Sequence, residues 1–292
     1  MRFLLTGASG FIGSEITARL IASGHEVIGV SRNRTVQQCQ MYVGSITDEM
    51  FIKDLIRKVK NVDLVIHLAA TKEGSEHSKI FETNVYGTDL ILRTAIELGS
   101  KQFIMISGVS VCNNGGPEVI SEESLPCPKG AYLLTKYLSE QVLFQNDKFR
   151  GQKKVVRIPS PVGPALSKEK IFKNFVESAL LDLDLEVWGN GKRLQNYLDL
   201  RDFNDAIELL IQYTGEGIWN IAGPEAISDE DLANKVIKLT NSSSQIKILN
   251  KIGVPETSMS KISTLKVQND LGMKFERSIE DTIFWVSKGV SA

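Results

Sequence analysis

The chain begins with the sequence MRFLLTGASGFIG, residues 1–13. Arg2 to Leu5 is a short, largely apolar run that predicts a buried strand, and apolar residues then recur at helical spacing from Ile12 to Ile21. A glycine-rich turn joins the two elements. A strand, such a turn and a helix together form the arrangement that binds a dinucleotide pyrophosphate. The glycines let the backbone approach the phosphates, and the helix start offers free N–H groups and a positive dipole end.

The glycines of this turn are Gly7, Gly10 and Gly13, and their spacing is G-x-x-G-x-x-G rather than the commoner G-x-G-x-x-G. The same residues would also serve a tight strand-to-helix turn that binds no ligand. Because the turn opens an alternating pattern of strands and helices, the position favours a cofactor site. Phe11 and Ile12 pack the helix onto the sheet under either interpretation.

The composition is that of an ordinary globular enzyme. The 292 residues are 42% hydrophobic and 24% charged, with a net charge of −1. That balance gives no electrostatic reason to expect a nucleic-acid or anionic-membrane partner. No apolar run reaches the roughly 18 residues of a transmembrane helix, and no signal-peptide pattern is completed after residue 5. Three cysteines with no C-x-x-C pair fit reduced thiols, so we expect a cytoplasmic protein. The three histidines lack metal-ligand spacing, so no metal site is expected.

Strands and helices alternate through the first half of the chain. The expected strands are 2–5, 27–30, 41–43, 64–67, 103–106 and 154–158, and the expected helices after the first are 48–59, 78–98 and 131–145. Near-continuous apolar strands separated by amphipathic helices predict a parallel sheet that is covered on both faces. The fold class is therefore α/β.

The pattern loosens after Pro159, where residues 159–164 predict a rigid loop. The expected elements beyond it are helices at 170–181, 202–213, 228–239 and 278–285, and strands at 185–188 and 197–200. We expect a doubly wound Rossmann domain over 1–160, to which 196–214 return. A smaller C-terminal substrate-binding part should comprise mainly 161–195 and 215–292.

A second candidate site lies on the helix expected at 131–145. Tyr132 and Lys136 are four residues apart and therefore share one helical face. A lysine ammonium beside a tyrosine stabilises the phenolate, which brings a group of ordinary pKa near 10 toward useful proton transfer. Two ordinary surface residues at helical spacing are the alternative. The place of the pair, after the strand at 103–106, favours catalysis.

Several motifs occur in order and carry a family resemblance. They are Thr6 to Gly13, Val65-Ile66-His67-Leu68-Ala69-Ala70, Asn84-Val85-Tyr86-Gly87-Thr88, Tyr132-x-x-x-Lys136, Arg157 to Pro164, Trp188 to Gly191, Tyr197 to Asp202 and Asn220 to Gly223. Together they cover most of the chain. The sequence resembles the extended short-chain dehydrogenase/reductases, in the group of nucleotide-sugar epimerases and dehydratases.

The resemblance implies a role for each matched residue. The three glycines would hold the pyrophosphate, with Ser9, Phe11 and Ile12 beside it. The other implied cofactor residues are Leu68, Ala69, Ala70 and Pro159. Asn84 would support the active-site strand and helix, Tyr132 would be the acid/base, and Lys136 would hold the nicotinamide ribose. Core packing for Leu68 to Ala70 and helix capping for Asn84 are the alternatives. The resemblance also implies a homodimer through the helices near Thr88 and Tyr132.

The cofactor side departs from the family pattern at the end of the second strand. Family members that use NAD usually carry an acid there, whereas this chain has Ser31, then Arg32 and Arg34. A missing negative charge with added guanidinium groups suits a 2′-phosphate, so we expect NADP(H) in preference to NAD(H). The alternative is that Arg32 is a solvated loop residue. The acid expected near the adenine is replaced by Ser45, beside Ile46.

The catalytic side departs from the family at the hydroxyl partner of the tyrosine. Ser107 matches the first of two hydroxyl positions, but Gly108 falls on the second, which hydrogen-bonds the reacting sugar oxygen. Losing one such donor lowers a rate by two to three orders of magnitude when it acts as an oxyanion-type donor. Ser110 or a water is the candidate substitute. The dehydratase subgroup has Asp-Glu where this chain has Val109 and Ser110, which argues against a dehydratase.

The substrate half is altered as well. Ser160 and Gln195 stand where the family often has an Asn and an Arg near nucleotide phosphates, and Arg193 lies close enough to supply charge. The expected substrate is a nucleotide-activated sugar. Three functions stay open: a keto-sugar reductase, which the Ser31-Arg32 pair favours; an NAD-dependent nucleotide-sugar epimerase, such as a 4-epimerase; and a weakly catalytic or non-catalytic NAD(P)-binding protein, which Gly108 suggests.

Overall fold

The computed structural model describes residues 1–33, 39–113, 119–249 and 261–290. The chain divides into two compact units. Unit 1 comprises 1–112, 122–158 and 208–220, and unit 2 comprises 113–121, 159–207 and 221–292. The division falls within helix α7 (Leu200–Gln212).

Unit 1 is built on a seven-stranded sheet in the order β10-β6-β5-β4-β1-β2-β3, and every neighbouring pair is parallel. In that order the strands are β10 (Gly217–Asn220), β6 (Gln152–Ile158), β5 (Gln102–Gly108), β4 (Leu64–His67), β1 (Arg2–Thr6), β2 (Glu26–Ser31) and β3 (Gln40–Val43). The chain order reverses between β1 and β4. Ligands of open parallel sheets bind outside the carboxyl ends of the strands at such a switch point.

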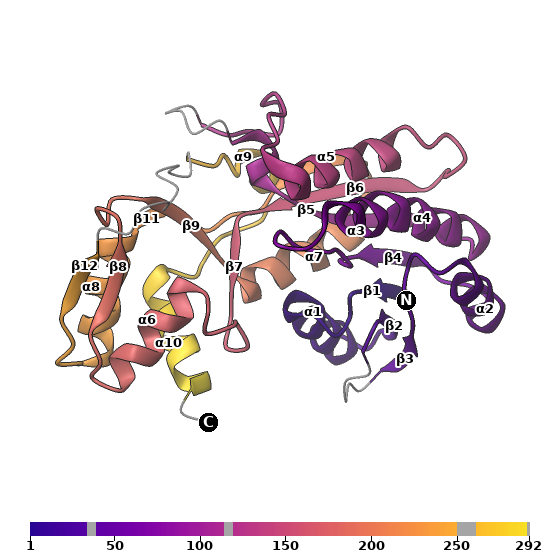
Figure 1. Ribbon diagram of the computed structural model, residues 1–292. Helices are drawn as coiled ribbons and strands as arrows, with labels where there is room; N and C mark the ends of the chain where they lie inside the picture. Colours follow the sequence, from indigo (N-terminus) through magenta and orange to yellow (C-terminus); the bar gives the residue numbers. More distant parts are fainter. Residues whose placement is uncertain (34–38, 114–118, 250–260, 291–292) are drawn as a thin grey trace. The chain divides into compact units, whose positions relative to one another are not determined.

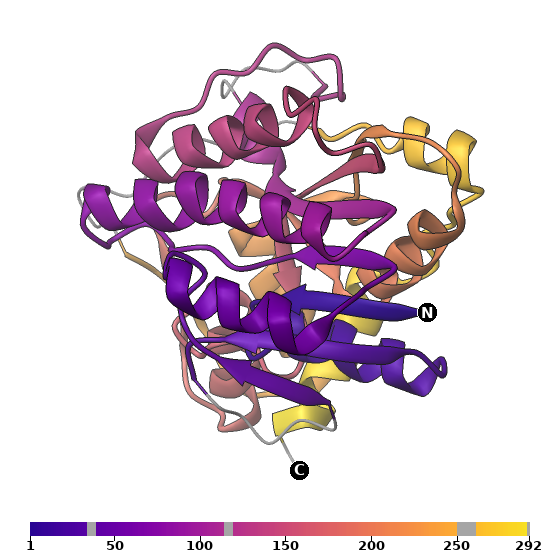
Figure 2. The same cartoon turned by 90° about the vertical axis from the view of Figure 1, so that its right-hand side faces the viewer.

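Two layers of helices cover this sheet (Figure 1). Helices α2 (Glu49–Val59), α4 (Gly87–Glu97) and α5 (Gly130–Phe144) share one core cluster with strand residues such as Leu4, Val65 and Phe103. Figure 2 shows α4 and α5 running side by side. Helix α1 (Phe11–Ala22) packs on β1 and β2. Because side chains alternate along β1, the buried Phe3 and Leu5 face the layer opposite to Leu4.

Unit 2 contains two small sheets. β7 (Ser160–Val162) pairs parallel with β9 (Leu194–Asp199), which pairs antiparallel with β11 (Ala226–Ser228). β8 (Leu185–Trp188) pairs parallel with β12 (Ile246–Leu249). The helices of this unit are α6 (Ile171–Leu180), α8 (Asp229–Thr240), α9 (Leu265–Leu271) and α10 (Ile279–Val290). Its own core gathers side chains such as Phe175, Leu232 and Ile283.

The predicted α/β fold with a parallel, doubly covered sheet is confirmed, and three local predictions need correction. The single helix expected at 78–98 is α3 (His77–Phe81), a π-helical turn η1 (Glu82–Tyr86) and α4. The expected rigid loop after Pro159 contains β7. The strand at 197–200 was expected to return to the main sheet, but β9 belongs to the three-stranded sheet of unit 2 and β10 makes the return. Residues 208–220, rather than 196–214, therefore rejoin unit 1.

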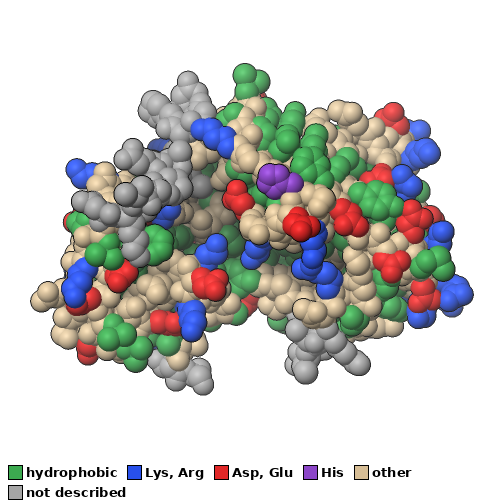
Figure 3. All heavy atoms as spheres, in the orientation of Figure 1, with side chains coloured by type: hydrophobic (Ala, Val, Ile, Leu, Met, Phe, Trp, Pro, Cys, Tyr) green, Lys and Arg blue, Asp and Glu red, His purple; other side chains and the backbone are tan. Residues whose placement is uncertain are grey.

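Charge is distributed without a dominant sign on the face drawn in Figure 3, where Lys and Arg side chains alternate with Asp and Glu. Among the helices of the described ranges, none combines the length and the apolar character that crossing a bilayer requires. Within those same ranges, no three His, Cys, Asp or Glu side chains gather into a group that could hold a metal ion.

Candidate active site

The glycine turn at the end of β1 is compact for a steric reason. Gly7 has φ +75°, and a Cβ there would lie 2.8 Å from the Ala69 nitrogen. A Cβ on Gly13 would lie 2.1 Å from the Gly7 carbonyl oxygen. The Gly10 N–H donates to that same oxygen at 2.9 Å. The predicted glycines are therefore required where the backbone passes close to itself and to the end of β4.

The turn delivers the start of α1 to the carboxyl edge of the sheet. Gly10 is the N-cap and supplies no side-chain cap, and the first turn of this fully described helix has no acidic residue. Its N–H groups and dipole are thus available to an anion. Ser9, Phe11 and Ile12 flank this position and are half-buried. A cradle that a Cβ would fill, ending at an uncapped helix start, fits a dinucleotide pyrophosphate.

The end of β2 carries a hydroxyl where a carboxylate would serve NAD. Ser31 is buried, and its hydroxyl donates to the Asn33 carbonyl oxygen. Arg32 follows and is exposed. Arg34 lies outside the described residues. The Ser31 hydroxyl is thus already engaged, and Arg32 is the described guanidinium at this strand end.

Two further predicted cofactor residues follow β3. The Ser45 hydroxyl lies 2.9 Å from the Thr47 hydroxyl, and both are half-buried. Ile46 is buried in the core of unit 1, where its side chain packs against Gly87 at the start of α4. Ile46 therefore has a packing role whether or not an adenine lies nearby.

The end of β4 lies against the glycine turn. The Leu68 N–H donates to the Thr6 carbonyl at 3.1 Å, and the Ala69 N–H donates to the Thr6 hydroxyl at 3.3 Å. Leu68, Ala69 and Ala70 are all half-buried rather than sealed in the core. The structure thus brings the Leu68–Ala70 segment and the glycine turn together, as the cofactor interpretation requires.

Asn84 ties the turn after β4 to helix α5. Its Oδ1 accepts from the Thr71 N–H at 2.7 Å, and its Nδ2 donates to the Thr71 carbonyl and to the Thr135 hydroxyl. Asn84 is buried within the π-helical turn η1, a type of distortion that is frequent at functional sites. These contacts match the predicted supporting role better than simple helix capping.

Tyr132 and Lys136 lie on the first two turns of α5. Lys136 is buried and its Nζ donates to the Ile106 carbonyl oxygen on β5 at 2.5 Å. Burial lowers the pKa of Lys136 to about 8, an effect that Glu140 opposes. Tyr132 is half-buried, and burial together with the Glu73 carboxylate raises the pKa of its phenol. A phenol of raised pKa needs added positive charge to release its proton, and the assignment of Lys136 to this task stays a prediction.

Of the two hydroxyl positions at the end of β5, the first carries a hydroxyl, on Ser107, and the second, at Gly108, carries none. The Ser107 hydroxyl is buried and donates to Glu140 Oε1 at 2.6 Å, so it already has a protein partner. Among the residues that the structure describes, a Cβ on Gly108 would meet only the Ile158 carbonyl oxygen, at 3.9 Å. Ser110 is half-buried in the short helix η2 (Val109–Cys112) that follows β5. The second position is therefore open space that a serine side chain could fill.

A buried ion pair beneath this edge was not predicted from the sequence. Arg157 Nη2 lies 2.6 Å from Glu140 Oε2, and Arg157 Nε donates to Glu140 Oε1 at 3.0 Å. Arg157 Nη1 also lies 3.2 Å from Cys112 Sγ. Glu140 is one helical turn beyond Lys136, and Arg157 interrupts an apolar strand. Those two signals are present in the sequence, because a charge at a core position requires a partner.

The predicted substrate residues of unit 2 have partners of their own. The Ser160 hydroxyl donates to Gln195 Oε1 at 3.4 Å. Arg193 pairs with Asp229 at the start of α8, with Nε 3.0 Å from Oδ2. Pro159 is half-buried and begins this part of the chain. The pair with buried Asp229 compensates the Arg193 charge, which weakens the expectation that Arg193 replaces a lost phosphate-binding arginine.

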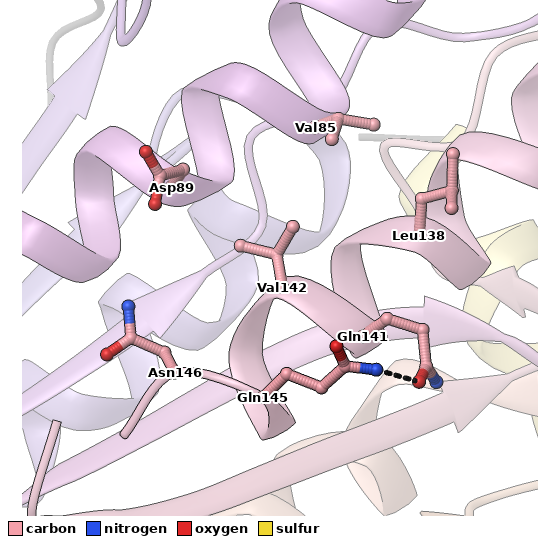
Figure 4. Close-up of a pocket in the computed structure, with 7 residues that line it drawn as sticks. All are labelled: Val85, Asp89, Leu138, Gln141, Val142, Gln145 and Asn146. Carbon is pink, nitrogen blue, oxygen red and sulfur yellow. Dashed lines mark hydrogen bonds between the residues drawn. The ribbon is translucent and has the colours of Figure 1, made fainter. Parts of the chain in front are cut away.

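A shallow hollow on the outer side of α5 is separate from these groups (Figure 4). It has a volume of about 340 Å³ and contains none of the predicted site residues. Val85, Leu138 and Val142 give it an apolar lining. At one end Gln145 Nε2 donates to Gln141 Oε1 at 3.2 Å. The hollow is a feature of the α4–α5 surface rather than of the carboxyl edge of the sheet.

Comparisons with known proteins identify the family of the chain. Residues 3–222 match the NAD dependent epimerase/dehydratase family. The match takes in more than half of the chain, including the glycine turn, Asn84, Tyr132 and Lys136. The chain therefore belongs to this family, which confirms the predicted membership of the extended short-chain dehydrogenase/reductases.

Individual relatives are distant. The chain is 27% identical over 270 residues to a dTDP-D-glucose 4,6-dehydratase of Dictyostelium discoideum, covering 82% of this chain and 62% of that protein. It is 26% identical over 270 residues to UDP-glucuronic acid decarboxylase 1 of Xenopus tropicalis, covering 86% and 63%. The chain thus spans less than two thirds of the length of these two relatives.

Solved structures establish the fold over the whole chain. A UDP-glucose 4-epimerase of Thermotoga maritima, crystallised with UDP-glucose, superposes with a TM-score of 0.89 at 23% identity, covering 100% of this chain and 99% of that one. A UDP-glucuronic acid 4-epimerase of Bacillus cereus, in complex with NAD, gives 0.86 at 22% identity with the same coverage. The predicted Rossmann-like α/β fold is confirmed.

Proposed function

We propose that the chain is a nicotinamide-dinucleotide-dependent enzyme that transfers hydride at a keto or hydroxyl carbon of a nucleotide-activated sugar. The observation that carries this proposal is the steric cradle of Gly7 and Gly13 below the uncapped start of α1. Asn84 ties the neighbouring strand end to the helix of Tyr132 and Lys136. Support for the substrate comes from the relatives, whose names specify UDP- and dTDP-sugars.

The residues divide the work as follows. The glycine turn and the α1 start hold the pyrophosphate, and Leu68 to Ala70 line the dinucleotide. Lys136, fixed by the Ile106 carbonyl, supplies the positive charge near the ribose and the tyrosine. The bound nicotinamide accepts or donates hydride. Tyr132 releases a proton to the sugar oxygen when the carbon is reduced and takes one when it is oxidised. Ser110 or a water is the proposed second partner of that oxygen, because Gly108 provides none.

Two outcomes of hydride transfer are compatible with these groups. The relatives found by structure include 4-epimerases, which favours oxidation and re-reduction of one sugar carbon. Ser31 and Arg32 at the end of β2 instead favour NADP(H), which suits a keto-sugar reductase. We propose NADP(H) as the preferred cofactor on this ground. Dehydration is less favoured, since Val109 and Ser110 offer no carboxylate for an elimination.

Substitution of Tyr132→Phe tests the assignment of the acid/base. Turnover of the purified enzyme is measured with UDP- and dTDP-sugars in one series. In a second series it is measured with the 4-keto forms of these sugars and NADPH. We expect turnover to fall by about two to four orders of magnitude while cofactor affinity stays within a few-fold. Tyr137→Phe, on the same helix, is the matched control and should leave turnover unchanged. Turnover that survived in Tyr132→Phe would remove the assignment.

The cofactor bound after purification separates the two outcomes. An epimerase should carry NAD through purification and need no added cofactor, because the hydride returns to the same substrate. A reductase should consume NADPH in proportion to product. A protein that binds cofactor and turns over neither series would instead be a binding protein.

We also propose a homodimer formed through α4 and α5. The hollow lies on this surface, and the part of its lining formed by Val85, Leu138 and Val142 gives a second copy an apolar contact. The rest of its lining is polar: Asp89, Gln141, Gln145 and Asn146. Sedimentation of the wild type should give a dimer. Val142→Glu should shift it to a monomer, and a wild-type monomer would contradict the proposal.

A further inference from the structure

A buried histidine lies at the centre of unit 1 and has no role in the proton transfer proposed above. His67 is the last residue of β4 and is only 2% exposed. Its Nδ1 lies 2.7 Å from the Thr6 hydroxyl, at the end of β1. Its Nε2 lies 3.0 Å from the Thr88 hydroxyl on α4. The ring therefore bridges the strand that precedes the glycine turn and a helix of the outer layer.

The neighbouring hydrogen bonds determine which ring nitrogen carries the proton. The Thr88 hydroxyl donates to the Asn84 carbonyl oxygen, so toward His67 it can only accept. His67 Nε2 must then be the donor. The Thr6 hydroxyl accepts from the Ala69 N–H, which leaves its own hydrogen for the ring. With Nδ1 as the acceptor of that hydrogen, every member of the chain is satisfied by a neutral ring.

The surroundings of the ring also favour its neutral form. Burial, with a smaller contribution from the Lys136 ammonium, lowers the pKa of His67 to about 3. The Phe103 ring lies at a centroid distance of 5.9 Å, tilted by 48° to the imidazole, and offers no countercharge. An imidazolium would present a second donor to the Thr6 hydroxyl, which would then have to turn its own hydrogen away from the ring to accept. The tautomer with hydrogen on Nε2 is thus held by geometry on both sides.

The chain of hydrogen bonds continues to the tyrosine helix. The Asn84 carbonyl oxygen accepts from Thr88 and from the Ser139 hydroxyl of α5, the latter at 2.6 Å. Asn84 Nδ2 donates to the Thr135 hydroxyl at 3.0 Å, and that hydroxyl donates to the Tyr132 carbonyl at 2.8 Å. A path of hydrogen bonds, buried except for its part-buried last member, therefore runs from Thr6 through the backbone and side chain of Asn84 to the backbone carbonyl of Tyr132.

We propose that His67, as the neutral ring with its proton on Nε2, is a positioning residue that sets the glycine turn in register with the Tyr132–Lys136 helix. The positioning role of His67 rests on the proposed function, whereas the assignment of its tautomer is independent of that function. A dinucleotide has to meet the glycine turn with its pyrophosphate and Lys136 with its nicotinamide ribose. The register between the glycine turn and the helix of Lys136 therefore affects the affinity for the whole dinucleotide, but not the affinity for a fragment that contacts only the turn.

The tautomer is tested first by two-bond ¹⁵N–¹H correlation spectra of histidine-labelled protein, with His67→Gln used for assignment. We expect one histidine with hydrogen on Nε2 that does not titrate between about pH 8 and pH 5.5. A ring protonated on Nδ1, or one that titrates within this pH range, would overturn the assignment.

The positioning role is tested by comparing the affinity for a whole dinucleotide with the affinity for a fragment that lacks the nicotinamide. The dinucleotide is NADH or NADPH, whichever the wild type binds more tightly. The fragment is ADP-ribose for NADH and 2′-phospho-ADP-ribose for NADPH. In His67→Phe the affinity advantage of the dinucleotide over its fragment should fall about tenfold, while fragment affinity stays within a few-fold. His67→Gln, which keeps a donor and an acceptor, should restore most of it, and His77→Gln is the control. Thr88→Val breaks the same path from the other side, and covers the case in which His67→Phe does not fold.

An equal loss for both probes would mean that His67 is only structural, and an unchanged advantage in both His67→Phe and Thr88→Val would likewise overturn the positioning role. If the wild type bound neither dinucleotide, the proposed function itself would fail and the positioning role with it. The tautomer would still be decided by the spectra.

Discussion

Adding one methyl group at Gly13 tests the steric basis of the cofactor cradle. A Cβ there would lie 2.1 Å from the Gly7 carbonyl oxygen and 2.9 Å from both the Gly7 carbonyl carbon and the Ala8 Cα. All three atoms belong to the backbone of the turn, so no side chain can rotate away. Gly13→Ala therefore has to displace either the Gly7 peptide or the start of α1, and these are the two features that form the anion site.

The expected magnitude follows from that overlap. Overpacking a tight site costs about 1–3 kcal/mol, which corresponds to about a 5- to 150-fold loss of affinity when the displaced atoms form the binding site. Calorimetric titration with NADPH and NADH measures the loss, and urea unfolding reports any change in stability. Gly10→Ala should be milder, since its Cβ would lie 3.1 Å from the Gly7 oxygen. Ala18→Ser, exposed on the same helix, is the control. Gly13→Ala with wild-type affinity would refute the cradle.

Four further outcomes are expected. Gly108→Ser should raise turnover by about 10²–10³-fold, because the added Cβ has room and the serine hydroxyl supplies the missing hydrogen-bond donor. Steady-state kinetics with the preferred sugar measure this gain, and no gain is expected if Ser110 already serves as that donor. The affinity of the wild type for the cofactor should decline as the pH rises through about 8, where Lys136 loses its proton. The Lys136→Arg variant should keep its cofactor affinity over the same pH range. Calorimetric titrations on both sides of pH 8 measure both affinities. Arg157→Met should lower the free energy of unfolding by about 3–5 kcal/mol in urea titrations, because it leaves Glu140 buried without its cation, and adding Glu140→Gln should recover part of the loss. The pKa of His67 is lowered from 6.5 to about 3, so between those pH values only the unfolded chain takes up this proton, and the folded state loses stability as the pH falls. Over the full interval this loss in the free energy of unfolding is about 5 kcal/mol. In urea titrations near pH 4, His67→Gln should therefore lose less stability on acidification than the wild type does.

The parts of the fold that local sequence determines were predictable. β4 is 64–67 in both the prediction and the structure, because a short apolar run between turn residues has one suitable conformation. The glycine turn was also predictable, since few other reasons place three glycines between a strand and a helix. Both features depend on contacts close in sequence.

The parts that depend on distant contacts were not predictable in the same way. The π-helical turn at 82–86 interrupts a continuous helical pattern, and its Asn84 carbonyl is satisfied by hydroxyls of Thr88 and Ser139 rather than by a local signal. β10 rejoins the main sheet by pairing with β6, a partner about 60 residues away. The Glu140–Arg157 pair joins a helix to a strand in the same manner.

The candidate site shows the same division. Residue type and spacing singled out Tyr132 and Lys136, and the family resemblance singled out Asn84. It did not show that the Ser107 hydroxyl is taken by Glu140, or that Arg193 is paired with Asp229. Which partner a polar side chain finds is a property of the packed chain. The roles assigned to these residues stay predictions until they are measured.

The most direct test of the central claim is calorimetric titration of the purified protein with NADPH and with NADH, after absorbance has been used to detect any cofactor already bound. We expect saturable binding of at least one dinucleotide, with NADPH preferred, and an affinity about 5- to 150-fold weaker in Gly13→Ala. A preference for NADH, or NAD retained through purification, would contradict the assignment of Arg32 and place the epimerase first. Binding of neither dinucleotide by a folded, cofactor-free protein would contradict the claim that the turn at Gly7 to Gly13 is a nucleotide site.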